Sequence, residues 1–265
     1  MIQFDAKRYW AERSVAYRST MDTDYHKSRL AMVDALIGGR LAGNLVDFGC
    51  GDGIYLERHE ASGGTSIGID IDPEMVNVAR QRVATYGGRH QVKEGGVERL
   101  VEIESESCDM VLALNVLAYL DDAQCGTFYC QAARILKKGG SLIVTHSNEL
   151  FDMFTFNKYT VDFFERNFNV SGLENLLVHW DKPDRLPLPT RENPLSFAHK
   201  LHRYGLLEEK QEFSIPHAIP PLLDDRFEPD DLVSRKVTVT QVARPEDRWK
   251  LASTCSIFGS RSVRA

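Results

Sequence analysis

Residues 45–53 read LVDFGCGDG, and this stretch decides the fold of the chain. A short, mostly apolar run leads into Gly49, Gly51 and Gly53, which follow a G-x-G-x-G spacing. Glycine lets a chain turn sharply and brings the backbone close to a ligand. In open α/β sheets, ligands bind at the carboxyl ends of the strands. The stretch therefore predicts a strand, a ligand-binding turn and a helix.

The sequence on both sides of this turn alternates between strand-like and helical segments. Predicted strands cover residues 44–48, 65–69, 90–93, 108–114, 141–145, 206–213 and 254–258. Predicted helices cover residues 22–38, 53–59, 73–86, 121–136 and 194–205, with a further short helix within 5–20. Lys137-Lys138-Gly139-Gly140 is expected to close the helix over 121–136. Strands separated by helices indicate a mostly parallel sheet with helices on both faces. We predict a doubly wound, seven-stranded α/β fold with an inserted cap.

The alternation stops after residue 147, and this break divides the chain. The following segment is rich in aromatic residues and then in proline, and long irregular segments tend to be lids or binding loops. The expected parts are an amino-terminal lid with the first helix, a ligand-binding core, a cap insertion, and the end of the core with a proline-rich insertion and a final strand. They cover residues 1–40, 41–147, 148–192 and 193–265, respectively.

Composition excludes several classes of protein. The chain has 265 residues, a formal net charge of −6 and five cysteines, none of them in a C-x-x-C pair. A duplex-binding protein usually carries a basic field, so nucleic acid is not expected as a partner. No apolar run is long enough for a membrane span, and the charged amino terminus is unlike a signal peptide. Reduced thiols fit a cytoplasmic protein. The sequence leaves formation of a homodimer open.

Two kinds of cofactor fit the glycine turn. A dinucleotide fingerprint requires a third glycine where this chain has Ile54. A diphosphate also gains from a helix amino terminus, whereas S-adenosylmethionine has no phosphate and carries a sulfonium and an ammonium. Asp47, on the strand before the glycines, suits such a cationic end. Asp70 ends the second strand, where its carboxylate can accept both ribose hydroxyls of either cofactor.

Several segments together resemble the class I S-adenosylmethionine-dependent methyltransferases. They are VDFGCGDG, GIDIDPEMV, EGGVERL, CDMVLALNVLAYLDD and ARILKKGGSLIVTHS, within residues 46–147. The resemblance implies a Rossmann-like sheet whose final strand, TCSIFGS, lies antiparallel beside the fifth. It also implies S-adenosyl-L-methionine as the cofactor. A metal site is not expected, because His199 and His202, three residues apart on a predicted helix, have no obvious third ligand. The implied cofactor-binding residues are Asp47, Gly49, Cys50, Gly51, Gly53, Asp70, Ile71, Gly96, Val97, Asn115 and Val116.

The resemblance gives some of these residues a specific place. Asp70 stands at the ribose-binding position, and Ile71 would pack on the adenine. Gly96 occupies the position of an aspartate that often contacts the adenine amino group, so the backbone of Val97 would meet the ring edge instead. Asn115 and Val116 fall near the sulfonium.

Methyl transfer also needs an acceptor and, for a hydroxyl acceptor, usually a base. His146 ends the fifth strand, and His217 lies between prolines in FSIPHAIPP; both are candidate bases. Tyr25, His26 and Arg29 on the first long helix could touch the methionine end of the cofactor. The predicted function is transfer of a methyl group to a small molecule, a hydroxyl of a sugar or natural product. The alternatives are N-methylation of a small amine, a catalytically silent binding protein, and a nucleotide-dependent oxidoreductase or epimerase.

Overall fold

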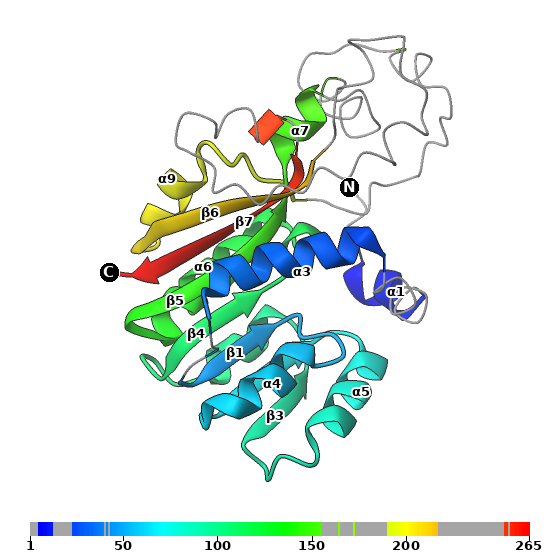
Figure 1. Ribbon diagram of the computed structural model, residues 1–265, viewed down its shortest axis with the longest axis vertical. Coiled ribbons are helices and arrows are strands. Elements are labelled where there is room, and N and C mark those ends of the chain that lie inside the picture. The colour runs from blue at the N-terminus through cyan, green and yellow to red at the C-terminus, as the bar shows by residue number, and fades with distance from the viewer. Residues whose placement is uncertain are drawn as a thin grey trace.

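The computed structural model describes residues 5–12, 23–39, 41, 43–154, 164, 172, 190–216, 252–253 and 255–265. Within them, seven strands form a single sheet in the order β3-β2-β1-β4-β5-β7-β6 (Figure 1). The strands are β1 (Leu45–Phe48), β2 (Ser66–Asp70), β3 (His90–Glu94), β4 (Cys108–Ala113), β5 (Leu136–Ser147), β6 (Leu206–Pro216) and β7 (Cys255–Arg264). The first five strands run parallel, and β7 is antiparallel to both β5 and β6. The predicted doubly wound, seven-stranded sheet and its antiparallel final strand are therefore confirmed.

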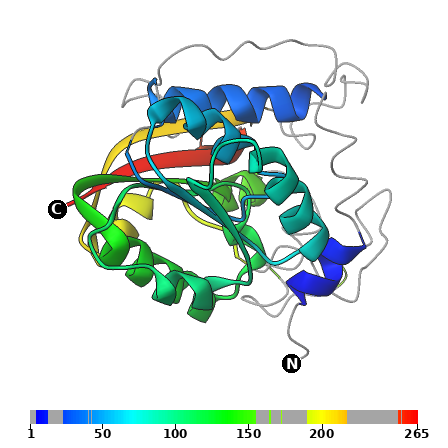
Figure 2. The same cartoon turned by 90° about the horizontal axis from the view of Figure 1, so that it is seen from below.

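Helices connect the strands and cover the sheet. They are α1 (Ala6–Ala11), α3 (Asp24–Ile37), α4 (Ile54–His59), α5 (Pro73–Val83), α6 (Asp122–Ile135), α7 (Glu149–Phe154) and α9 (Phe197–His202), with 3-10 turns η1 (Glu60–Ser62), η2 (Val97–Glu102) and η3 (Leu117–Tyr119). Helices α3 and α6 lie on opposite faces of the sheet (Figure 2). None of the helices in the described ranges has both the length and the hydrophobicity needed to cross a membrane.

Local sequence explains where the helices begin and end. Asp72 caps α5 by accepting the backbone N–H of Glu74 at 2.8 Å, and Pro73 occupies the first helical position. Asp121 and Gln124 form a capping box at the start of α6. Helix α3 ends at Gly38, whose left-handed φ of 68° suits a residue without a side chain. These signals were readable in the sequence, and the corresponding helix predictions were close to the observed bounds.

One predicted boundary was wrong. The run Lys137–Gly140 follows the end of α6 at Ile135, as expected, but the fifth strand was expected to begin at residue 141, whereas β5 begins at Leu136. Leu136 is fully buried and pairs with Cys108 of β4, while the ammonium of Lys137 lies 2.8 Å from the Asp109 carboxylate. Pairing of Leu136 with Cys108 therefore starts the strand before the lysine and glycine run. The register then shifts, Gly139 has a left-handed φ of 74°, and pairing resumes between Met110 and Ser141.

The two faces of the sheet pack against different helices. One face is covered by α6 and α9, which contribute Phe128, Tyr129 and Phe197 to the largest buried cluster. On the other, Val33, Leu36 and Ile37 of α3 pack against Leu112 and Ile143 of the central strands. Because β1 and β4 are neighbours while the chain moves outward from them in opposite directions, a crevice is expected at their carboxyl ends.

Several predictions fall outside the described residues. They concern His217, most of the cap insertion over 148–192, and most of the proline-rich insertion. The predictions of a cap and of a homodimer stay predictions.

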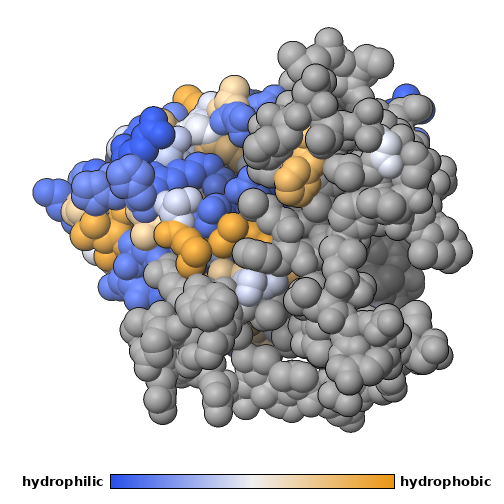
Figure 3. Space-filling view, turned by 90° about the horizontal axis from the view of Figure 1, so that it is seen from above, coloured by the Kyte–Doolittle hydropathy of each residue, from blue (hydrophilic) through white to orange (hydrophobic). Residues whose placement is uncertain are grey.

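On the face shown in Figure 3, hydrophobic and hydrophilic residues are interspersed over the described part of the surface.

Candidate functional site

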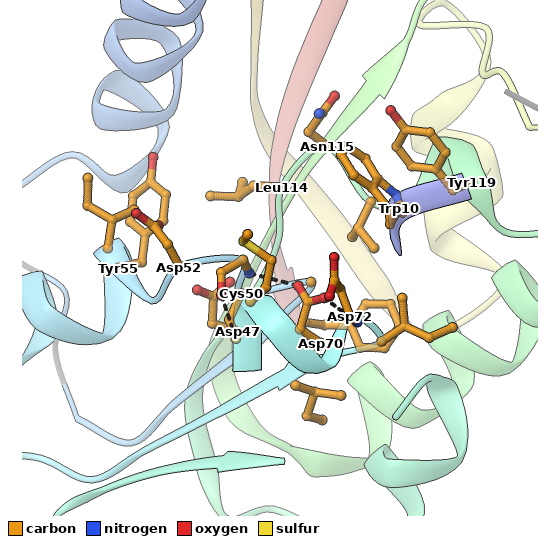
Figure 4. Close-up of a pocket in the computed structure, with 18 of the residues that line it drawn as sticks. Trp10, Asp47, Cys50, Asp52, Tyr55, Asp70, Asp72, Leu114, Asn115 and Tyr119 are labelled. Carbon is orange, nitrogen blue, oxygen red and sulfur yellow. Dashed lines mark hydrogen bonds between the residues drawn. The ribbon is translucent and has the colours of Figure 1, made fainter. Parts of the chain in front are cut away.

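A cavity of about 320 Å³ lies at the carboxyl ends of β1, β2 and β4 (Figure 4). It is lined by nine of the eleven residues predicted to bind a cofactor, namely Asp47, Gly49, Cys50, Gly51, Asp70, Ile71, Gly96, Asn115 and Val116. His26 and Arg29 of α3 line it as well, as the sequence led us to expect. Gly53 and Val97 are not among the lining residues. The sequence-predicted residues thus come together at the crevice that the strand order creates.

The glycine turn shapes the floor of this cavity. Gly49, Gly51 and Gly53 all have left-handed φ angles, of 77°, 52° and 81°. A Cβ atom on Gly49 would lie 2.6 Å from Cβ of Val116, so this glycine lets the turn after β1 pack against the turn after β4. A Cβ atom on Gly51 would meet no atom within 4 Å, because that residue borders open space. Gly53 packs instead against Ala79 of α5, which explains why it does not line the cavity.

Asp70 is held at the end of β2 by two backbone groups. Its Oδ2 accepts the N–H of Gly51 at 2.8 Å, and its Oδ1 accepts the N–H of Asp72 at 2.9 Å. Burial raises the pKa of this carboxyl, while the two backbone hydrogen bonds work against that rise. Each carboxylate oxygen retains a further lone pair. Asp70 therefore joins the glycine turn to the end of β2 and can still accept hydrogen bonds from a ligand in the cavity.

Asp47 is a buried carboxyl that the protein leaves incompletely satisfied. Its side chain is 2% exposed, and its Oδ2 has no hydrogen-bond partner among the described residues. Burial, together with the nearby carboxylates of Asp70 and Asp52, raises its pKa to about 8. A cation placed in the cavity would stabilise the ionised form of Asp47. This orphaned acid fits a positively charged ligand group.

The charge of the cavity lining distinguishes a dinucleotide from S-adenosylmethionine, the two cofactors that fit the glycine turn in the sequence. The described lining holds four acidic side chains, those of Asp47, Asp52, Asp70 and Asp72, of which Asp47 is mostly protonated at neutral pH until a cation binds, and one guanidinium, that of Arg29. Asp52 is compensated by an ion pair with Arg82 at 2.6 Å. A diphosphate would face uncompensated like charge here, whereas an ammonium or sulfonium would be attracted. The lining therefore disfavours a dinucleotide.

Aromatic side chains form another part of the wall. Trp10 of α1 lies with its ring centroid 5.0 Å from that of Tyr119 in η3, at 70°. Lys7 of the same helix pairs with Glu94 at the end of β3, at 2.9 Å. Helix α1 therefore borders the cavity, and the amino-terminal lid stays a prediction.

Sequence reasoning missed several lining residues, including Tyr55, Asp72, Met75 and Tyr119. Two of them lay within recognisable motifs: Tyr119 follows the fourth strand in NVLAYL, and Asp72 comes two positions after Asp70. Met75 and Tyr55 reach the cavity from the first turns of α5 and α4. Helix phase at those turns was the signal that could have found them.

His146 is not among the residues that line this cavity. The side chain is 2% exposed, and its Nε2 is 2.9 Å from the hydroxyl of Tyr129. Its ring lies against Phe197 and Phe258, with centroid distances of 4.8 and 5.5 Å. Burial, and to a lesser extent Lys200, lowers the pKa of His146 to about 3. This environment is that of a neutral core histidine, and it does not support the prediction that His146 is a base.

His26 is the histidine that the described lining contains. It is 4% exposed, and its Nδ1 lies 3.3 Å from Nη1 of Arg29. Burial and the adjacent guanidinium lower its pKa, which favours a neutral imidazole. Because the guanidinium only donates, this contact assigns the acceptor role to Nδ1.

The predicted adenine-side residues lie at the end of β3. Gly96 lines the cavity, and its N–H donates to Oε1 of Glu98 at 2.7 Å. Val97 packs against the main core cluster. The structure thus brings Gly96 to the cavity and turns the side chain of Val97 toward the protein interior.

Comparison with known proteins identifies the class of this domain. Residues 46–144 match the family model described as a methyltransferase domain. A ubiquinone biosynthesis O-methyltransferase from Nitrosomonas europaea is 30% identical over 112 residues, which cover 42% of this chain and 47% of that protein. The chain thus matches about half the length of this relative.

Solved structures agree on the fold. A SAM-dependent methyltransferase from Archaeoglobus fulgidus aligns with a TM-score of 0.59 and 13% identity, over 95% of this chain and all of that one. Phosphoethanolamine N-methyltransferase 2 from Haemonchus contortus, in complex with S-adenosyl-L-methionine, aligns with a TM-score of 0.59 and 15% identity, over 100% of this chain and 60% of that one.

The chain therefore carries, over residues 46–144, a methyltransferase domain of the class I S-adenosylmethionine-dependent family. The sequence-based family prediction is confirmed, and with it S-adenosylmethionine as the cofactor of the class. The residues present fit this cofactor: a carboxylate at the end of β2, an orphaned acid on β1 and open space above Gly51.

Proposed function

We propose that this chain binds S-adenosylmethionine in the cavity at the ends of β1, β2 and β4 and transfers its methyl group to a small molecule. The acceptor group that we propose is a hydroxyl of a sugar or natural product. The proposal rests on the charge of the lining, above all on the buried and incompletely satisfied carboxyl of Asp47. When bound, the cofactor supplies a methyl group on a positively charged sulfur.

The residues of this chain have separate tasks in the proposed site. Asp70 accepts the ribose hydroxyls while its backbone partners keep the carboxylate oriented. Asp47 faces the ammonium or sulfonium of the ligand, and the guanidinium of Arg29 faces the carboxylate of the ligand. Gly51 leaves room for the ligand to approach the backbone of the turn. Binding and alignment in a site shielded from water are the main contributions that methyl transfer requires.

One observation supports a small acceptor with an apolar or planar face, and another supports an oxygen nucleophile. Trp10 and Tyr119 supply flat aromatic surfaces next to the site. The curated relative from Nitrosomonas europaea is named for O-methylation in ubiquinone biosynthesis. A second candidate, N-methylation of a small amine, is favoured by the fold neighbour from Haemonchus contortus. His217 lies outside the described residues and stays a candidate base, whereas His26 provides a neutral imidazole at the cavity.

Binding measurements test the cofactor part of this proposal. Calorimetric titration of the full chain with S-adenosylhomocysteine is expected to show saturable binding, and titration with NAD is expected to show none. Saturable NAD binding without S-adenosylhomocysteine binding would instead favour a nucleotide-dependent oxidoreductase.

Product analysis tests the acceptor part. The chain is incubated with methyl-labelled S-adenosylmethionine and a panel of phenols, sugars and primary amines. Mass spectrometry is expected to find the label on a phenolic or sugar oxygen. Label on nitrogen alone would favour the second candidate, and cofactor binding without transfer to any member of the panel would favour a catalytically silent binding protein.

A further inference from the structure

Asn115 adopts an unusual backbone conformation at the wall of the cavity. It follows β4, has a left-handed φ of 57° and lines the cavity. Figure 4 shows its side chain on the same side of the cavity as Tyr119 and Trp10. Residues other than glycine rarely adopt this conformation unless their surroundings impose it, although asparagine tolerates it better than most. Something in the structure must therefore hold the turn in place.

Thr145 of β5 provides that restraint from behind. Its hydroxyl Oγ1 accepts the backbone N–H of Asn115 at 2.7 Å. Thr145 is 2% exposed and does not line the cavity, so its hydroxyl acts through Asn115. The neighbouring ladder pairs Ala113 with Val144, which places Thr145 next to the point where β4 ends. A hydroxyl at this position gives the N–H of Asn115, two residues beyond the last pair of that ladder, a hydrogen-bond partner.

The turn is also fixed from its other side. Val116, the next residue, occupies the space in which a Cβ atom on Gly49 would lie, at 2.6 Å. The Asn115–Val116 turn is thus enclosed between Thr145 on β5 and the glycine turn after β1. Any change in the backbone at Asn115 moves both a lining side chain and the contact between the two turns that form the cavity.

We propose that Thr145 is a positioning residue, whose hydroxyl holds the Asn115–Val116 turn in the shape that the methyl-donor site requires. The inference rests on the proposed function, since it assigns that cavity to S-adenosylmethionine. Thr145 touches neither cofactor nor acceptor; it fixes the residue that does.

Two substitutions separate the hydroxyl from the shape of the side chain. Thr145→Val keeps the branched shape and removes the acceptor, whereas Thr145→Ser keeps the hydroxyl and removes only a methyl group. Thr145→Ala is a second hydroxyl-free variant if the valine protein does not fold. Three quantities are measured on each full-length variant: amide hydrogen exchange at Asn115, affinity for S-adenosylhomocysteine by calorimetry, and melting temperature.

Thr145→Val is expected to speed exchange at Asn115 about tenfold and to weaken S-adenosylhomocysteine binding about three- to tenfold, as loss of one hydrogen bond implies. Thr145→Ser is expected to stay within about twofold of the wild type in both. A lower melting temperature with unchanged affinity in Thr145→Val would overturn the inference, because it would show a purely structural role. If the wild type itself does not bind S-adenosylhomocysteine, the proposed function fails and this inference fails with it.

Discussion

Asp47 and His146 are both buried, ionisable side chains on parallel strands of one sheet, yet their surroundings differ. Asp47 lies on β1 and lines the cavity, which His146 does not. Among the described residues, both leave one buried polar atom without a partner, Oδ2 of Asp47 and Nδ1 of His146. His146 lies on β5 and packs between Phe197 and Phe258, with its Nε2 beside the Tyr129 hydroxyl. Burial raises the pKa of Asp47 to about 8 and lowers that of His146 to about 3, so each group is held in its neutral form.

The neighbours of each strand explain the difference. Strand β1 lies between β2 and β4, where the chain leaves in opposite directions and opens a crevice. Strand β5 has β7 on its outer side, and His146 is paired with Phe258 in that antiparallel ladder. A polar residue near the end of a strand is therefore a site candidate only where the strand order leaves the end uncovered.

The largest expected effect is on cofactor affinity in Asp70→Ala. This change removes the proposed acceptor of the ribose hydroxyls, the hydrogen bond to Gly51 in the glycine turn and the hydrogen bond to Asp72 after β2. S-adenosylhomocysteine binding, measured by calorimetry, should weaken roughly 100-fold, since hydrogen bonds to a charged group are the stronger ones. Asp122→Ala, at an exposed position on α6, is the matched control and should bind like the wild type. Equal affinity in Asp70→Ala would contradict the assignment.

Alanine at two glycines tests the close contact of the turns. In Gly49→Ala, the new methyl group overlaps Val116, and the alanine must adopt a left-handed φ. The free energy of unfolding should therefore fall by about 3 kcal/mol. In Gly51→Ala, the methyl group enters open space, and only the backbone strain of about 1 kcal/mol remains. Urea unfolding measures both values. A larger loss in Gly51→Ala than in Gly49→Ala would mean that the two turns are packed differently.

The pH dependence of binding tests Asp47. Its carboxyl, with a pKa of about 8, is mostly protonated at neutral pH and must release a proton to pair with a cation. Affinity for S-adenosylhomocysteine should therefore rise between pH 6 and pH 8, by up to about tenfold per unit. Asp47→Asn should bind more weakly at pH 8 and show a flatter profile. A wild-type affinity that is constant across this range would place the cationic group elsewhere.

The smallest expected effect is on acid stability, through His146. Its pKa is about 3 in the folded protein and about 6.5 in the unfolded chain. Between pH 3 and pH 6.5, the unfolded chain binds a proton on His146 that the folded protein does not bind. The folded state is therefore fully stable towards this titration above pH 6.5 and loses stability as the pH falls below that value. Between pH 6 and pH 4, His146→Gln should remove a slope of about 1 kcal/mol per pH unit from urea-derived stability. Parallel slopes in both proteins would mean that His146 titrates normally.

Much of the fold was predictable because local signals and the sheet agree. The glycine turn, Asp72 before α5 and the capping box before α6 each define an element from nearby residues. The strand onset at Leu136 was missed, because pairing with Cys108 overrides the lysine and glycine pattern there. Local propensity is a weak guide where tertiary contacts decide.

The candidate site was predictable where it lies at strand ends. The positions of Asp47, Asp70 and Asn115 could be inferred from the predicted strands, because each lies at or near the carboxyl end of one. All three line the cavity. His146 was misleading because sequence does not show which strand end is covered. Tyr119 was missed because its role depends on the approach of Trp10 from a helix more than a hundred positions earlier in the chain.

A crystal structure of the full chain with S-adenosylhomocysteine tests the central claim most directly. We predict the ribose hydroxyls within hydrogen-bonding distance of the Asp70 carboxylate and the amino group on the Asp47 side of the cavity. A nucleoside bound instead beside His146 at the end of β5, or a crevice at Gly49–Gly53 that the ligand does not enter, would contradict the account.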